Sequence, residues 1–286
     1  MRSWHKFFLS KNSEIDMNLA GDQTYFDHER SMDGYNENKY YKNKELFSET
    51  YFNNRYKSYT IIIKKFLSKK NKILSIGSGR CISELTLLND GYNIICSDME
   101  IPNCYKASKK IFCNYEYQKL NILEENLNQK FNSVICFSMI YLFQEKDLEI
   151  FFKRISNLLE NEGLLIVDPG GSEANLFSLI YDKIYLPTES YLVFLLSKLF
   201  GRQYFLFKKH QGYKFANKEL IRIAKKNGFK FLQINESDYE LEFSRSKLLG
   251  FLMRKFPKTK GIFNLFGKLL PYVRIFTFKK ISEKNI

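Results

Sequence analysis

The feature that most constrains this chain is an alternation of short apolar runs with amphipathic segments over residues 72–168. The apolar runs predict five β-strands, at residues 73–76, 92–97, 116–120, 133–137 and 164–167. Helices are expected between these strands, because a chain returns to a parallel neighbour only through a crossover connection. The alternation therefore predicts an α/β fold with a mainly parallel sheet and helices on both faces.

A helical stretch is expected after the first strand, with Ile82, Leu85 and Leu88 on one side. Further helices are expected over residues 49–69, 102–111, 123–129 and 146–160. Apolar residues repeat every three or four positions in the last of them, and Gly163 follows where a C-terminal glycine belongs. Beyond it, Asn217 is expected to cap a helix that runs to Lys226 and ends at Gly228. Two more strands, 229–234 and 273–278, bring the expected sheet to seven strands.

Three segments lie outside this pattern. Residues 1–47 are polar and tyrosine-rich and predict a loosely ordered arm or lid before a domain of residues 48–286. Residues 171–212 and 236–271 are expected to be helical insertions after the fifth and sixth strands. Pro257 divides the second insertion into two short helices, a helical hairpin, because proline breaks a continuous helix.

Composition limits where the protein acts. With 286 residues and 44% hydrophobic content, the chain can bury a large core without disulfides or metal. Its five cysteines are odd in number and scattered, which is typical of a reducing compartment. The sequence has neither a signal-peptide core nor an apolar run of the roughly 18 residues that a membrane span requires. We therefore expect a cytoplasmic protein, with peripheral contact at the inner face of the membrane as a further expectation from its charge.

A glycine turn marks the expected ligand site. The first strand ends in Gly77-Ser78-Gly79 and a helix follows, which places backbone N–H groups and a helix N-terminus at the carboxyl edge of the sheet. Asp98 ends the next strand, 19 residues after Gly79, where a carboxylate can accept both hydroxyl protons of a ribose. Ile82 replaces the third glycine of the dinucleotide fingerprint, which disfavours an oxidoreductase.

The segment 73–81 resembles motif I of the class I, Rossmann-like S-adenosylmethionine-dependent methyltransferases, and the similarity extends over residues 72–168 and the two closing strands. The resemblance implies a seven-stranded sheet with an antiparallel last strand and S-adenosylmethionine as cofactor. It also assigns roles. The glycine turn approaches the methionine part, Asp98 the ribose and Met99 the adenine; Asn121 and Ile122 lie near the adenine amino group, and Phe137 at the cofactor's mouth.

The sequence departs from that family at two positions. Ser75 stands where motif I usually has an acid, and Cys81 replaces its third glycine. A non-catalytic relative with the same fold therefore remains an alternative. Arg55 or Tyr56, on the helix before the first strand, could bind the cofactor's carboxylate in place of the missing acid, although a solvated arginine and a core tyrosine are the simpler interpretation.

The expected reaction is methyl transfer to a small molecule or to a lipid- or glycan-linked acceptor, with oxygen as the acceptor atom. Such transfer depends mostly on alignment, and a base helps when the acceptor is a hydroxyl. His210 is the candidate base, against the default of a surface histidine. No cluster of residues has metal-ligand spacing, so no metal is expected.

The charge of the chain, +14, favours an anionic partner. Residues 244–282 hold ten Lys and Arg and no acid, and in 244–270 the basic residues alternate with large apolar ones. That mixture suits peripheral contact with an anionic membrane, although a helical cap with a solvated basic face fits equally. An RNA methyltransferase is the alternative function; nucleic acid is the less favoured partner because no RNA-binding module is recognisable.

Overall fold

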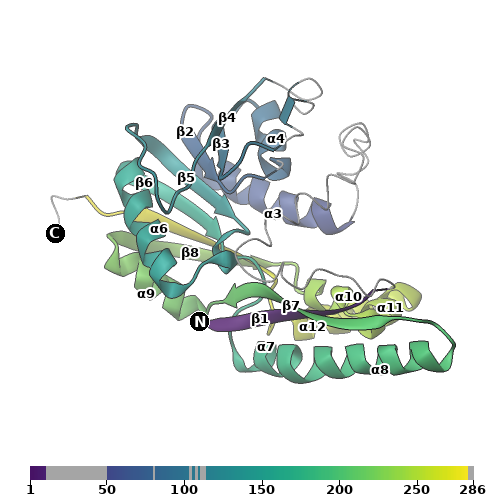
Figure 1. Ribbon diagram of the computed structural model, residues 1–286. Helices are drawn as coiled ribbons and strands as arrows, with labels where there is room; N and C mark the ends of the chain where they lie inside the picture. Colours follow the sequence, from purple (N-terminus) through teal and green to yellow (C-terminus); the bar gives the residue numbers. More distant parts are fainter. Residues whose placement is uncertain (11–49, 80, 103–104, 107–108, 110–113, 283–286) are drawn as a thin grey trace.

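The computed structural model describes residues 1–10, 50–79, 81–102, 105–106, 109 and 114–282 (Figure 1). Its centre is a seven-stranded sheet of order β4-β3-β2-β5-β6-β9-β8. The strands are β2 Lys72–Ile76, β3 Asn93–Asp98, β4 Glu116–Lys119, β5 Phe131–Phe137, β6 Leu159–Asp168, β8 Phe229–Ser237 and β9 Val273–Lys280. Pairing is parallel from β4 to β6, and β9 runs antiparallel to both β6 and β8. The predicted seven-stranded α/β fold with an antiparallel last strand is confirmed.

Alternate residues of the central strand point to two separate apolar cores. Ile73 packs with buried residues of α3 Thr50–Phe66 and α4 Ile82–Asn89 on one face. Leu74 packs on the other face, with buried residues of α6 Glu145–Leu158 and α9 Asn217–Lys226. The sheet is therefore buried on both sides, which accounts for strands that read as nearly continuous apolar runs (Figure 1).

Beside the sheet lies a second body, which we call the appended lobe. It is built from segments far apart in the sequence: β1 Arg2–Ser10, α7 Leu176–Ile180, the π-helix η4 Tyr181–Tyr185, α8 Leu186–Leu199, β7 Phe205–Lys214, α10 Leu241–Arg245, α11 Lys247–Lys255, the 3₁₀ turn η5 Pro257–Thr259 and α12 Lys260–Gly267. A two-stranded antiparallel ribbon of β1 and β7 runs through it, with α8 packed along the ribbon (Figure 1).

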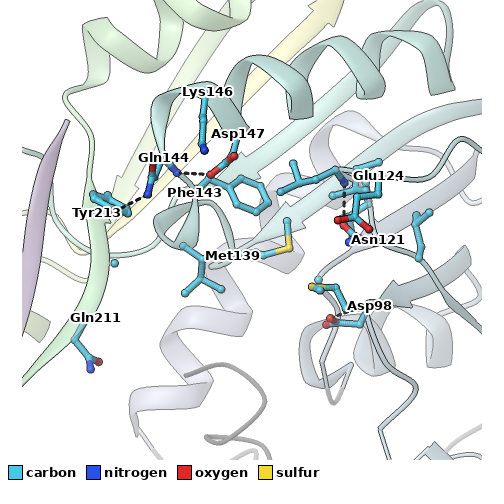
Figure 2. A pocket seen from close by; sticks show the side chains of 18 of the residues that line it. Asp98, Asn121, Glu124, Met139, Phe143, Gln144, Lys146, Asp147, Gln211 and Tyr213 are labelled. Atoms are coloured by element: carbon cyan, nitrogen blue, oxygen red, sulfur yellow. Dashed lines mark hydrogen bonds between the residues drawn. The ribbon is translucent and has the colours of Figure 1, made fainter. Parts of the chain in front are cut away.

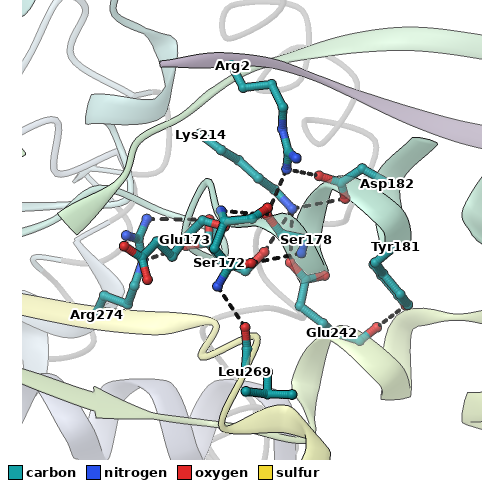
Figure 3. Close-up of polar contacts among 12 residues, drawn as sticks. Arg2, Ser172, Glu173, Ser178, Tyr181, Asp182, Lys214, Glu242, Leu269 and Arg274 are labelled. Atoms are coloured by element: carbon teal, nitrogen blue, oxygen red, sulfur yellow. Dashed lines mark hydrogen bonds and ion pairs between the residues drawn. The ribbon is translucent and has the colours of Figure 1, made fainter. Parts of the chain in front are cut away.

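A buried ionic network holds the lobe together (Figure 3). Lys214 has no exposed side-chain surface, and its ammonium donates to Asp182 at 3.0 Å and lies 3.5 Å from Glu242. Arg2, from β1, donates to the other oxygen of Asp182 at 2.7 Å. The Lys214 ammonium also lies 4.9 Å from the centroid of the Trp4 ring. Two cations and two anions thus neutralise one another where β1, β7, η4 and α10 meet.

Residues 2–10 form a strand, with a register shift between Trp4 and His5, so the expectation of a loosely ordered arm is wrong there. Their partner is β7, inside the insertion that was expected to be helical, and the register joins Arg2 to Lys214 and Ser10 to Phe205. Neither strand has a clear period-two pattern, because the ribbon places charged as well as apolar side chains in the interior. The division into an arm and a domain of 48–286 stays a prediction.

Three local expectations are corrected. Gly163 lies within β6 and not after a helix, since α6 ends at Leu158 and the chain enters the strand directly. Residues 123–129 are not helical: a turn at residues 122–124 leads into irregular chain, where Arg154 donates to the backbone oxygen of Glu125 at 2.7 Å. The N-cap of α9 is Ala216, and Asn217 is its first helical residue, with its N–H donating to Glu173 at 2.8 Å.

Other expectations agree with the structure or lie beyond it. The chain does break at Pro257 into α11 and α12, as expected. Most of the helix expected at 102–111 lies outside the described residues, as do residues 11–47 of the arm. The side chains of Arg55 and Tyr56 are also outside what is described, so their suggested contact with a cofactor stays a prediction.

Candidate functional site

The carboxyl end of β2 turns sharply into α4 through the glycine turn. Gly77 has φ +68°, and a Cβ there would lie 2.4 Å from the sulfur of Met139, so no other residue fits without movement. Gly79 also has positive φ, +49°. The turn is fastened to β3 because the Ser78 N–H donates to the Ser97 oxygen at 2.9 Å and the Ser78 hydroxyl accepts from the Ser97 N–H.

Asp98, at the end of β3, faces this turn. One carboxylate oxygen accepts the N–H of Gly79 at 2.9 Å, and the other accepts the N–H of Met99 at 2.7 Å. The side chain is buried and lines a pocket beside Gly77. Since a carboxylate has about four acceptor sites, Asp98 can hold the glycine turn and also bind a hydroxyl group of a ligand.

The next wall comes from the turn after β4. Asn121 accepts the N–H of Leu123 with its side-chain oxygen at 3.1 Å, and its own N–H donates to Glu125 at 3.2 Å. Ile122 is buried in this turn, whereas Met99, across the pocket, is 43% exposed. An apolar slot with polar edges results, the kind of surface on which an aromatic ring packs.

The opposite wall joins the sheet to the appended lobe. The amide nitrogen of Gln144, the N-cap of α6, donates to the hydroxyl of Tyr213 on β7 at 3.3 Å. Gly212 has φ +127°, and a Cβ there would lie 2.2 Å from the backbone oxygen of Tyr141 in the 3₁₀ helix η3 Ile140–Leu142. Only glycine lets β7 approach this closely, and the approach places His210 at the pocket.

Together these walls enclose a pocket of about 340 Å³ at the carboxyl ends of β2, β3 and β4 (Figure 2). Its lining is Ile76, Gly77, Asp98, Met99, Leu120, Asn121, Ile122, Leu123, Glu124, Met139, Leu142, Phe143, Gln144, Lys146, Asp147, His210, Gln211, Gly212 and Tyr213. This size lies within the range of roughly 300–1,000 Å³ usual for small-molecule sites, and the carboxyl edge is where doubly wound sheets bind ligands.

The structure brings most of the predicted site residues together in this pocket: Gly77, Asp98, Met99, Asn121, Ile122 and His210. The pocket lining does not include Ser75, Ser78 or Gly79, whose hydrogen bonds shape the glycine turn next to it. Their roles toward a cofactor stay predictions. The location of His210 matters most, because it lies 112 residues from Asp98 in the sequence and reaches the pocket only through β7.

Phe137 is also placed away from the pocket lining. Its ring stacks on Tyr59 of α3, with centroids 4.1 Å apart and planes at 3°. The Tyr59 hydroxyl donates to the buried carboxylate of Asp168, which also accepts from Ser138 at 3.0 Å. This contact fixes α3 across the ends of β5 and β6, and Met139 and Phe143 line the pocket where Phe137 was expected.

A buried acid, Glu84, lies beside Ser75, the residue that replaces the usual acid of motif I, and the sequence analysis did not identify it. The Ser75 hydroxyl donates to Glu84, in the first turn of α4, at 2.7 Å, and Ser83 donates to the other carboxylate oxygen at 2.9 Å. Burial raises the pKa of Glu84 above its ordinary value, and the charge of Asp98 adds to the rise. The signal in the sequence was an acid in the first turn of the helix that follows the glycines.

Cys81, the other departure, is buried and adopts the left-handed conformation with φ +57°.

The remaining contributors come from tertiary structure. Met139, Phe143, Gln144 and Tyr213 carry no local signal that assigns them to a site, because their place depends on how β7 meets η3 and α6. Within the described residues, no group of three or more His, Cys, Asp or Glu side chains is arranged to hold a metal ion.

No protein-family model matches the chain, and no curated protein is similar to it in sequence. Solved structures are similar in fold. An S-adenosylmethionine-dependent methyltransferase from Clostridium acetobutylicum aligns at 15% identity and TM-score 0.52, over 86% of this chain and 100% of that one. The 1,6-didemethyltoxoflavin-N1-methyltransferase of Burkholderia thailandensis, solved with its substrate and S-adenosylhomocysteine, aligns at 13% and 0.52, over 94% of each chain.

A third structure is the magnesium protoporphyrin IX methyltransferase of Synechocystis with bound S-adenosylmethionine, at 11% identity and TM-score 0.53, over 94% of this chain and 99% of that one. At such low identities the shared feature is the fold. The chain has the class I, Rossmann-like fold of S-adenosylmethionine-dependent methyltransferases.

Proposed function

We propose that this protein is an enzyme that transfers a methyl group from S-adenosylmethionine to a small-molecule or lipid- or glycan-linked acceptor, at oxygen. The observation that carries the proposal is that Asp98, Gly77 and His210 line one pocket. An acidic side chain, a glycine turn and a base from a distant strand converge there, at the carboxyl edge of a methyltransferase-type sheet.

The residues of the pocket fit this cofactor. Asp98 offers a buried carboxylate to the ribose hydroxyls, and the apolar surfaces of Ile122 and Met99 suit a purine ring. The absence of a Cβ at Gly77 lets the backbone approach the ligand closely. When bound, the cofactor supplies an electrophilic methyl group on a sulfonium, so the protein has mainly to align the acceptor.

An oxygen acceptor must lose a proton, and His210 is our candidate for accepting it. Histidine changes its charge near neutral pH, and His210 lies in the pocket wall opposite the β2 and β3 ends. Its ring centroid is 5.1 Å from that of Tyr213 and 5.3 Å from that of His5. Both contacts are edge-on, with ring planes at 72° and 69°.

The cofactor assignment is tested by calorimetry with S-adenosylmethionine and S-adenosylhomocysteine. We expect Asp98→Ala to weaken binding by roughly 1–3 kcal/mol, the contribution of charge-assisted hydrogen bonds. Asp98→Asn keeps only one of the two oxygens that accept the N–H groups of Gly79 and Met99, and it should lose a similar amount. Asp90→Ala, at the far end of α4, is the matched control and should bind normally.

Equal affinity of the Asp98 variants and the parent protein would refute the assignment, and tighter binding of a nicotinamide dinucleotide would favour an oxidoreductase. The acceptor is sought by mass spectrometry of metabolites, lipids and RNA nucleosides from cells with and without the gene. A lost methyl group on RNA would favour the RNA methyltransferase, and no lost methyl group together with no cofactor binding would indicate a non-catalytic relative. His210→Gln should lower turnover and leave cofactor affinity unchanged.

A further inference from the structure

The outer surface of the appended lobe is unusually apolar. Along α7, η4 and α8, large apolar side chains are exposed to solvent, and most of them are about half exposed or more: Leu176, Phe177, Ile180, Ile184, Tyr191, Leu192, Leu195, Leu196, Leu199 and Phe200. Leu199 and Phe200, at the end of α8, are 80% and 79% exposed. The spacing of three or four residues along α8 makes a stripe on one side of the helix.

The helices α11 and α12, of which α11 contacts α8, carry further exposed apolar residues. These are Leu248, Phe251, Leu252, Phe256, Ile262, Leu265, Phe266 and Leu269. The contact between α11 and α8 is specific: buried Glu189 of α8 accepts the Ser246 hydroxyl and the Leu248 N–H of α11, both at 2.6 Å. We call the exposed apolar side chains of these two groups the apolar face. Monomeric proteins in water rarely keep so many large apolar side chains contiguous and exposed.

The charges around the apolar face are of one sign. Over residues 174–208 and 243–270 of the described chain, the acidic residues are Asp182 and Glu189, and both are buried in internal contacts. The exposed ionisable residues there are all basic: Lys183, Lys198, Arg202, Lys208, Lys247, Arg254, Lys255, Lys258, Lys260 and Lys268. A surface with an apolar centre and a purely basic surround complements the acyl boundary and the anionic headgroups of a bilayer.

We propose that the apolar face docks on the surface of a membrane that contains anionic lipids. No helix in the described part of the chain is long and apolar enough to span a bilayer, so the helices would lie along the interface. The charge pattern decides for a lipid surface over a protein partner, because protein interfaces are depleted of lysine. The inference does not depend on methyl transfer. β7 lines the pocket and also contacts α8, so a membrane at the apolar face would lie on the far side of α8 from β7.

The test is co-sedimentation of the full-length protein with vesicles of phosphatidylcholine alone or mixed with phosphatidylglycerol. We expect binding to the anionic vesicles only, decreasing as salt is raised, since the Debye length falls to about 3 Å at 1 M. Replacing Arg254, Lys255, Lys258 and Lys260 by Gln should lower the partition coefficient at least roughly tenfold. The matched control replaces Lys69, Lys70, Lys153 and Lys225, which are exposed on the sheet domain, and should bind normally.

A second variant tests the apolar part. Leu192, Leu196 and Leu199→Gln should weaken binding to anionic vesicles at least roughly tenfold, because less apolar surface enters the acyl boundary. Ile61 and Ile150→Gln, exposed on α3 and α6, are the control. Calorimetry with S-adenosylhomocysteine and circular dichroism monitor the fold of each variant, and both should be unchanged. Equal binding to neutral vesicles, no binding at low salt, or binding unaffected by both variants would overturn the proposal.

Discussion

The sheet domain and the appended lobe distribute polarity in opposite ways. In the sheet domain the interior consists mostly of two apolar cores, with buried carboxylates such as Asp98 and Asp168 at the carboxyl ends of strands, and ion pairs such as Lys226–Glu149 lie on the surface. In the lobe the ions are inside, with Lys214 fully buried, and the large apolar residues are outside. Water therefore favours the first arrangement directly, whereas the second requires another reason.

The interior of the lobe is held by ion pairs, and removing one partner leaves another charge buried and unbalanced. Bringing a charge out of water costs several kcal/mol, and only well-placed opposite charges offset it. Such a network gives little net stability, but it selects one register of β1 against β7 and one position of η4. The comparison teaches that buried charges give the lobe its specific arrangement. Its large apolar residues lie outside, where they can contact a partner.

The largest effect is expected from breaking the network. Lys214→Met should destabilise the protein by about 3–5 kcal/mol, because Asp182 and Glu242 would keep their charges in the interior with only Arg2 to offset them. Urea denaturation of the full chain measures this. The double variant Lys214→Met and Glu242→Gln leaves the Arg2–Asp182 pair balanced and should lose less. A double variant as unstable as the single one would contradict the account.

A matched pair of leucines sharpens the comparison between the two regions. Leu148 on α6 is completely buried, whereas Leu196 on α8 is 48% exposed. Leu148→Ala should cost about 2–5 kcal/mol of unfolding free energy through a lost contact and a cavity, and Leu196→Ala less than about 0.5 kcal/mol. Denaturation in detergent-free buffer is required, since the second residue is proposed to contact lipid. Similar costs would mean that α8 belongs to the core.

The smallest effect concerns a carboxyl inside the sheet domain. In the described chain, Glu84 is held by two hydroxyls, whereas Asp182 of the lobe has two cations. Because burial raises the pKa of Glu84, its ionised form is disfavoured in the folded state, and the protein loses stability as pH rises through that pKa. The melting temperature of Glu84→Gln, relative to the parent protein, should therefore rise as pH increases above about 4, the ordinary pKa of a glutamate. A constant difference would show that the pKa of Glu84 is the same in the folded and the unfolded protein.

Sequence alone was sufficient for the sheet. Its strands are short apolar runs, separated by segments in which apolar residues recur at helical spacing. Each of these signals is local, so the seven strands could be predicted, as could the place of Asp98 at the edge of the pocket. The lobe could not. β1 and β7 pair across 195 to 212 residues, and Lys214 reads as a surface lysine until its partners are known. For the same reason the sequence suggested His210 only as a weak candidate, and Gln144 and Tyr213 not at all.

The pairing of β1 with β7 also sets an order of events during synthesis. Arg2 leaves the ribosome first, but its partner Lys214 follows 212 residues later. At the usual elongation rate of about 5–20 residues per second, that delay is on the order of 10–40 s. For this time Trp4 and the other residues of β1 are without their native neighbours, while β2 to β6 have already emerged. During this delay, residues 2–10 are expected to be open to aggregation and to chaperone capture.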